Sequence, residues 1–282
     1  MTEKTVLIVS DIQAPLHDGA VLDNVLAFAK DLKPDRLVNV GDDWDAHEVS
    51  QYSRGRAGEY AGTLQAGLDV VASIHARFRE AVGDIPYDLS RSNHGDRLRK
   101  YLAQYAPALS SLRSLDIEEL AGYKAAGIAY HSEPFEVAPG WVACHGDEGS
   151  LSQIAGRTAS LLSAKWGVSV VCGHTHRAGL VPTSSGFAGR VTSTRWGFEV
   201  GHLMDVSQAT YLKGGSCDWQ QAFGLLRVRG DRVHPELIPI NDDGSFCVDG
   251  QWYPRARERS TKFELAARGY VGVTPNWSGR AA

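Results

Sequence analysis

Residues 168–176 read VSVVCGHTH, in which an apolar run gives way to glycine and two histidines. A short, continuous apolar run bounded by glycine is typical of a buried strand, and we predict one over Val168–Cys172. In open α/β sheets, ligands bind beyond the carboxyl ends of the strands. The stretch therefore predicts a buried strand that delivers two imidazoles, His174 and His176, to a site.

Four further predicted strands end on side chains that can bind a metal. They are Thr5–Ser10 before Asp11, Arg36–Val40 before Asp42, Tyr87–Ser92 before Asn93, and Trp141–Cys144 before His145. Helical periodicity predicts helices over Val21–Lys30, Glu59–Val82, Leu98–Leu120 with a break near Pro107, and Ser152–Trp166 with Ser152 as a candidate cap. This order predicts an α/β fold with parallel strands, followed by a β-rich half with a hairpin around Gly230.

The 282 residues are 43% hydrophobic and 22% charged, which is ordinary for a globular protein. We predict one domain over residues 1–252 and a basic tail over residues 253–282, where six lysines and arginines face two glutamates although the whole chain carries a net charge of -4. The tail is interpreted as a solvated end, with a polyanion-steering arm as the alternative.

No apolar run approaches the length of about 20 residues that a membrane span needs, and the N-terminal apolar run is too short for a secretory signal. The four cysteines show no regular spacing, so we interpret them as reduced thiols. These features predict a cytoplasmic protein without a membrane partner.

The residues at the strand ends form a mixed set of carboxylate, amide and imidazole: Asp11, Asp42, Asn93, His145, His174 and His176. Such a set suits manganese, iron or zinc better than magnesium or calcium, which prefer oxygen ligands. It is too large for one catalytic ion that keeps an open position. Two ions that share a carboxylate could clamp the attacking and leaving oxygens of a phosphoryl transfer, with His94 as an acid for the leaving group.

In this order, the motifs SDIQ, GDDWD, SNHGD, CHGD and GHTH resemble those of the calcineurin-like metallophosphoesterase family over Val6–Arg177. The compact length also resembles small stand-alone members of that family, including those of bacteriophages. The resemblance implies a four-layer α-β-β-α sandwich in which a hydroxide bridging two ions attacks phosphorus in line and His94 protonates the departing oxygen. It implies a first ion held by Asp11, Gln13, Asp42 and His176, and a second held by Asp42, Asn93, His145 and His174.

Three positions depart from the family pattern. Gln13 stands where histidine is usual, and its amide oxygen would bind an ion more weakly. Ser92 replaces the glycine before Asn93, and Gly95 replaces the acid after His94. Asp96 follows one place later and is a candidate for orienting His94, whereas Asp45 is interpreted as a supporting or turn residue rather than a ligand.

Candidate substrate-binding residues combine aromatic, imidazole and guanidinium groups, which could stack a base and steer phosphate. They are Trp44, His47, Arg97, Arg195, His202 and Trp219. Arg195, His202 and Trp219 lie in segments that we interpret as loops, and local packing is the alternative for these aromatic positions. His17 and His75 have no partner in the sequence and are interpreted as surface residues.

Together these features predict a dinuclear metal-dependent phosphodiesterase acting on nucleotide-type phosphodiesters, with cyclic nucleotides as one candidate class. Manganese is the first expectation for both ions, with iron or zinc as alternatives. A DNA or RNA nuclease of the same family, using the basic tail, is a second hypothesis that the acidic bulk charge disfavours. A catalytically silent interaction module is a third, suggested only by Gln13 and Gly95.

Overall fold

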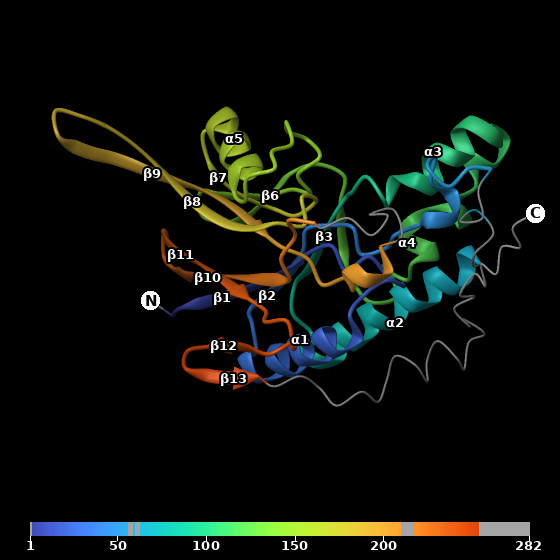
Figure 1. The fold of residues 1–282 in the computed structure, drawn as a ribbon, viewed down its shortest axis with the longest axis horizontal. Helices are drawn as coiled ribbons and strands as arrows, with labels where there is room; N and C mark the ends of the chain where they lie inside the picture. Colours follow the sequence, from blue (N-terminus) through green and yellow to red (C-terminus); the bar gives the residue numbers. More distant parts are fainter. Residues whose placement is uncertain (1, 56–58, 60–62, 210–216, 254–282) are drawn as a thin grey trace, which may run out of the picture.

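The structure is a computed structural model that describes residues 2–55, 59, 63–209 and 217–253. Two mixed β-sheets lie face to face, with α1 and α2 beneath the first sheet and α5 above the second (Figure 1). The first sheet has the strand order β11-β10-β1-β2-β3-β4, and the second has the order β5-β6-β7-β9-β8. This is the predicted α/β architecture of four layers.

The strands of the first sheet are β1 (Lys4–Val9), β2 (Arg36–Asn39), β3 (Tyr87–Ser90), β4 (Ala129–His131), β10 (Ala222–Arg229) and β11 (Arg232–Pro239). Those of the second are β5 (Phe135–Ala138), β6 (Trp141–Ala143), β7 (Ser169–Cys172), β8 (Ala178–Phe187) and β9 (Arg190–Val200). A small hairpin adds β12 (Phe246–Val248) and β13 (Gln251–Tyr253). The helices are α1 (Gly19–Leu32), α2 (Leu64–Val82), α3 (Asp96–Tyr105), α4 (Ile117–Leu120) and α5 (Arg157–Trp166).

Strand direction follows the connections. β1, β2, β3 and β4 are joined through helical segments and pair in parallel, whereas β10 and β11 form an antiparallel hairpin that closes with Arg229 opposite Arg232. This confirms the hairpin predicted around Gly230. In the second sheet β6 and β7 are parallel. Candidate ligands follow the carboxyl ends of five of these strands, which are β1, β2, β3, β6 and β7.

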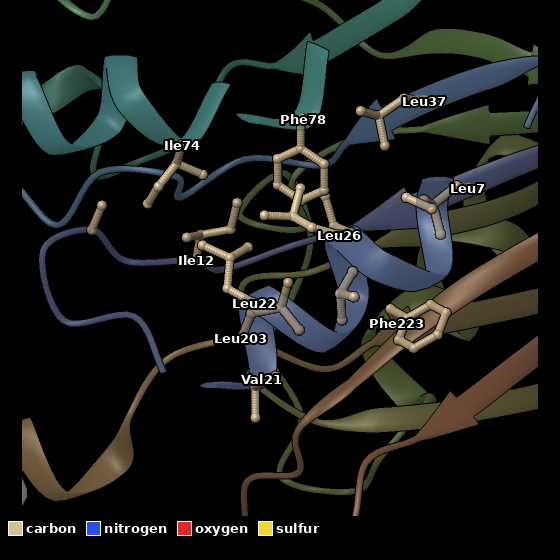
Figure 2. Packing of buried hydrophobic residues seen from close by; sticks show 14 of the residues in the cluster. Leu7, Ile12, Val21, Leu22, Leu26, Leu37, Ile74, Phe78, Leu203 and Phe223 are labelled. Atoms are coloured by element: carbon tan, nitrogen blue, oxygen red, sulfur yellow. The ribbon is translucent and has the colours of Figure 1, made fainter. Parts of the chain in front are cut away.

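Three hydrophobic cores fill the spaces between the four layers. Successive side chains of a strand point to opposite faces, so Leu7 and Val9 of β1 pack toward α1 and α2, while Val6 and Ile8 pack between the sheets. Figure 2 shows the first of these cores. In β7, Val171 joins the core between the sheets. Apolar residues on both faces explain why these strands form continuous runs rather than alternating patterns.

Helix starts differ from the predictions where capping decides the boundary. α2 begins at Leu64 rather than Glu59, because the Thr63 side chain accepts the Ala66 N–H. α5 begins at Arg157 after Gly156, and Ser152 is not its cap. The Ser152 hydroxyl instead accepts the Ile154 N–H in the preceding turn. The segment predicted over Leu98–Leu120 breaks as expected, since α3 ends before Pro107.

In the part of the chain that the structure describes, the helices lack the length and apolar character that crossing a membrane requires. Tyr253, the first residue of the predicted basic tail, ends β13 and packs against the rings of Phe28 and Phe246. Residues 254–282 lie outside the described residues.

Candidate metal centre

The carboxyl ends of β1, β2, β3, β6 and β7 meet at one end of the two facing sheets, and each is followed by a candidate ligand. Glycine allows this close approach. A Cβ atom at Gly41, whose φ is +104°, would lie 2.7 Å from His145 Nδ1, and one at Gly173 would collide with Ser10 and Asp11. Gly41 is therefore required by packing and by its positive φ, and Gly173 is required by packing.

His145 is the centre of the first group of ligand atoms. Its Nε2 lies 2.9 Å from Asn93 Oδ1, 3.1 Å from His174 Nδ1 and 3.3 Å from Asp42 Oδ2. Its Nδ1 lies 2.9 Å from the Val40 carbonyl, which can only accept, so Nδ1 carries a proton and Nε2 is the nitrogen left to bind a metal. The ligand atoms of Asp42, His145 and His174 all lie within 4.8 Å of one another. This group can hold a metal ion.

The second group adjoins it through Asp42. His176 Nε2 lies 3.1 Å from Asp11 Oδ1, and Gln13 Nε2 lies 3.2 Å from Asp42 Oδ2 and 3.3 Å from His176 Nε2. Gln13 Oε1 is buried without a hydrogen-bond partner among the described residues. Buried oxygens are usually paired, so this amide oxygen is available to a cation. Turning the Gln13 amide over would bring its oxygen to face Asp42 and His176.

The electrostatics of the site favour a positive charge. Burial lowers the pKa of His145, but Asp42 and Asp11 outweigh it and raise that pKa to about 10. Burial likewise raises the pKa of Asp42, yet His145 and His94 hold it well below its usual value. Carboxylates that stay ionised while fully buried need a compensating charge. These carboxylates, imidazoles and the unpaired amide oxygen fit divalent ions.

Five of the candidate ligands occupy left-handed backbone. The φ angles are +47° at Asp11, +54° at Gln13, +51° at Asp42, +67° at His174 and +56° at His176. Non-glycine residues rarely adopt this region, and such strain gathers at functional sites. The sharp corners turn each ligand back toward the shared edge immediately after its strand ends.

His94 lies beside the ligands and is oriented by Asp45. Its Nε2 is 3.7 Å from Asp42 Oδ2, and its Nδ1 is 3.3 Å from Asp45 Oδ1. Asp96, predicted as the orienting acid, instead pairs with Arg91. The prediction for Asp96 is wrong because the start of α3 directs its carboxylate away from the imidazole. Asp45 has the supporting role that was expected of it.

A buried polar network behind the Asp42 loop was missed in the sequence. Asp43 Oδ2 accepts from His75 Nε2 at 2.7 Å and from the Tyr123 hydroxyl at 2.8 Å, and His75 Nδ1 lies 2.7 Å from the Tyr87 hydroxyl. His75 is fully buried, so its interpretation as a surface residue is wrong. His17, interpreted likewise, is also buried. The network fixes Asp43 next to the candidate bridging ligand.

Glu199 supports the GHTH turn from β9. Its Oε2 accepts from the Thr175 hydroxyl at 2.8 Å, and its Oε1 accepts the Thr158 N–H at 2.8 Å in the first turn of α5. One buried carboxylate therefore caps a helix and holds the residue between His174 and His176. Glu199 belongs to β9, as does Arg195, so the loop predicted around Arg195 is a strand.

The predicted substrate residues divide into two groups. Trp219, with its ring 4.3 Å from that of His176, lies beside the ligands, as does Arg97, whose Nη2 is 2.8 Å from His94 Nε2. His47 approaches Asp45 at 3.8 Å.

Three other substrate assignments fail. Trp44 is fully buried in the first core, and His202 is 1% exposed behind His176 and Trp219, so neither has surface to offer a substrate. Arg195 lies in β9, four residues before Glu199, which pairs with Cys172 at the carboxyl end of β7. Four strand residues span about 13 Å, so Arg195 lies that far along β9 from the end where the ligands gather. Aromatic side chains occur in packed interiors as well as in binding sites. The sequence around Trp44 and His202 does not show which of the two applies.

No protein family model matches the chain. The Gene 54 protein of Mycobacterium phage D29 is 36% identical over 250 residues, which cover 88% of this chain and 97% of that protein. The chain belongs to the Gene 54 protein family of mycobacteriophages. Another member, from Mycobacterium phage L5, is 35% identical over 251 residues, covering 88% of this chain and 98% of that protein.

Among solved structures, Vacuolar Protein Sorting 29 from Cryptosporidium parvum matches with a TM-score of 0.43 and 12% identity, covering 90% of this Gene 54 family chain and all of that chain. Vps29 complexed with zinc from Entamoeba histolytica matches at 0.41 and 10% identity, covering 88% and 95%. Likeness at this level carries no inference about activity. The structure has the α/β fold with two mixed sheets that the resemblance to calcineurin-like metallophosphoesterases implied.

Proposed function

We propose that the protein is a dinuclear metal-dependent phosphodiesterase that hydrolyses nucleotide-type phosphodiesters. The observation that carries this proposal is the cluster around His145 Nε2, where Asn93, His174 and Asp42 each contribute an atom within 3.3 Å. The Asp11–His176 pair adjoins it through Asp42 and Gln13. An edge with two adjoining ligand groups is what a two-metal site requires.

The ligand sets follow the chain. Asp11, Gln13, Asp42 and His176 would hold one ion, and Asp42, Asn93, His145 and His174 would hold the other, with manganese expected first and iron or zinc as alternatives. Divalent ions bound there supply Lewis acidity toward phosphoryl oxygens and lower the pKa of water. Asp42 is the carboxylate shared between the two sets. The backbone N–H of His94 donates to its Oδ1 at 3.1 Å and helps to orient it.

His94 is proposed to donate a proton to the leaving oxygen from Nε2. A guanidinium can only donate, so the 2.8 Å contact from Arg97 Nη2 implies that Nε2 accepts when no substrate is present. Substrate phosphate would draw Arg97 away and allow His94 to carry a proton on Nε2, with Asp45 stabilising the imidazolium from the other side. Such an acid matters most for an alkoxide leaving group, which supports a diester substrate.

The proposal is tested with an activity panel in Mn²⁺ over cyclic nucleotides, dinucleotides, single-stranded DNA and phosphomonoesters. Wild-type protein and the His174→Ala variant are compared, with His234→Ala on the exposed part of β11 as the matched control. We expect diester hydrolysis that His174→Ala abolishes and the control retains.

Each other outcome identifies a rival. Hydrolysis of single-stranded DNA with a steep salt dependence would establish the nuclease alternative, because phosphate contacts release counterions. A protein that retains no Mn, Fe or Zn and hydrolyses none of the diesters would be a silent interaction module, and the proposal would be overturned.

A further inference from the structure

A cavity of about 370 Å³ lies directly beside the candidate metal centre, between α3 and the segment around residues 48–54. Asn93, a candidate ligand, forms one end of its lining, next to Arg97. Figure 1 shows α3 on the same side of the molecule as the carboxyl end of β3. Its volume falls within the range of small-molecule sites, about 300–1,000 Å³. None of the functional assignments above uses this cavity beyond Asn93 and Arg97.

Tyrosines line the part of the cavity farther along α3 from Asn93. Tyr101 and Tyr105 are one helical turn apart and thus share a face, with ring centroids 5.0 Å apart at 58°. Tyr52 faces the cavity from the other wall and is 72% exposed. The Arg54 guanidinium lies 4.2 Å from the Tyr105 ring centroid and covers that ring. Tyrosines that are exposed in a cavity, rather than packed in a core, supply surfaces on which flat rings stack.

Arg97 lies on α3 between the candidate metal centre and the tyrosines. Arg97 and Lys100 line the cavity from the face of α3 that also carries Tyr101, and Arg97 Nη2 contacts His94 at 2.8 Å. Glu48 and Glu59 are the acidic residues of the lining, against Arg54, Arg97 and Lys100. Along α3 the lining therefore begins with Arg97 beside the candidate metal centre and continues to Tyr101 and Tyr105.

We propose that this cavity binds the nucleoside of a nucleotide phosphodiester, with its base stacked on Tyr101 and Tyr52 and its phosphate beside Arg97. The inference rests on the proposed function, which puts the scissile phosphate at the metal centre. Stacking accepts every base because each has a π-face. The cavity therefore selects for a nucleoside without requiring one base, and the lining offers a guanidinium for phosphate.

Two substrates with the same scissile bond test this proposal: thymidine 5′-(p-nitrophenyl phosphate) and methyl p-nitrophenyl phosphate, of which only the first has a base. We expect Tyr101→Ala to lower kcat/KM for the thymidine ester by about 10- to 100-fold, the effect of losing one stacked base. The methyl ester should be little changed. Tyr101→Phe should restore the rate because it retains the ring, and Phe187→Ala, an exposed aromatic residue of β8, is the control.

Equal losses on the two esters, or no loss on either, would overturn the nucleoside site while leaving the phosphodiesterase proposal intact. If the wild-type protein hydrolyses neither ester, the phosphodiesterase proposal fails and the cavity is judged by binding alone. Calorimetry should then show that thymidine 5′-monophosphate binds more tightly than methyl phosphate, and that Tyr101→Ala removes the difference. Equal binding of the two phosphates by wild-type protein would overturn the nucleoside site.

Discussion

His94 Nδ1 lies 3.3 Å from Asp45 Oδ1, and the Asp45 carboxylate is buried behind the imidazole. The two motifs GDDWD and SNHGD thus meet in a pair that sets the direction of His94 Nε2. Burial raises the pKa of Asp45, but its close contact with His94, followed by the charge of Arg97, lowers it overall, so the carboxylate is ionised and able to stabilise a protonated imidazole.

The Asp45→Asn variant should lose this support. We expect kcat for diesters with alkoxide leaving groups to fall by roughly two to four orders of magnitude, the contribution of a general acid. Diesters that release p-nitrophenolate should lose far less, since that leaving group needs no proton. The measurement is rate against leaving-group pKa, with Asp96→Asn as control because Asp96 pairs with Arg91 instead. An unchanged leaving-group dependence in Asp45→Asn would remove its positioning role.

Metal content should respond differently to the two kinds of ligand. Asp42→Ala should lose both ions, because Asp42 approaches His145 at 3.3 Å and Gln13 at 3.2 Å. His176→Ala should lose only the ion beside Asp11. Elemental analysis after dialysis measures the stoichiometry without reference to activity. Loss of a single ion from Asp42→Ala would contradict its position as the shared ligand.

Gln13→His should tighten binding of the ion beside Asp11, because an imidazole nitrogen is a better ligand than an amide oxygen for manganese, iron or zinc. Gln13→Leu is the matched opposite, since it retains the bulk without a ligand atom and should weaken that ion alone. Calorimetric titration with Mn²⁺ separates the two binding steps. An unchanged affinity in both variants would show that Gln13 is not a ligand.

His17 should make the protein less stable in mild acid. Burial, followed by the charge of Arg77, lowers the pKa of His17 from 6.5 to about 4. As the pH falls from 6.5 toward 4, the unfolded chain binds a proton that the folded protein does not, so stability is lost in this window by at most about 3 kcal/mol. His17→Leu should flatten the denaturation free energy between these pH values relative to wild type. His234→Leu, an exposed substitution, should keep the wild-type slope, and an equal slope in His17→Leu would refute the assignment.

Sequence reasoning located the five strand ends because continuous apolar runs followed by polar residues are local patterns. The spacing of His75 from Val71 and Phe78 puts it on the buried face of α2. The prediction of a surface position was wrong because it followed the polarity of the imidazole rather than this helical spacing. The partner of His94 could not be found in this way, since Asp45 and Asp96 are both near a motif and only the turn into α3 separates them. Trp44 failed for a similar reason: nothing in its neighbourhood indicates which way its ring points.

The left-handed corners at Asp11, Gln13, Asp42, His174 and His176 have a consequence for how the scaffold could change. At each of these positions a non-glycine residue adopts a positive φ, which costs roughly 1 kcal/mol of conformational free energy. Glycine would remove this strain at any of them. A protein freed from its metal chemistry would therefore gain stability by exchanging ligands for glycine. In this protein carboxylates, an amide and imidazoles occupy these positive-φ positions. The candidate metal centre is therefore also the place where the protein is less stable than its fold would allow.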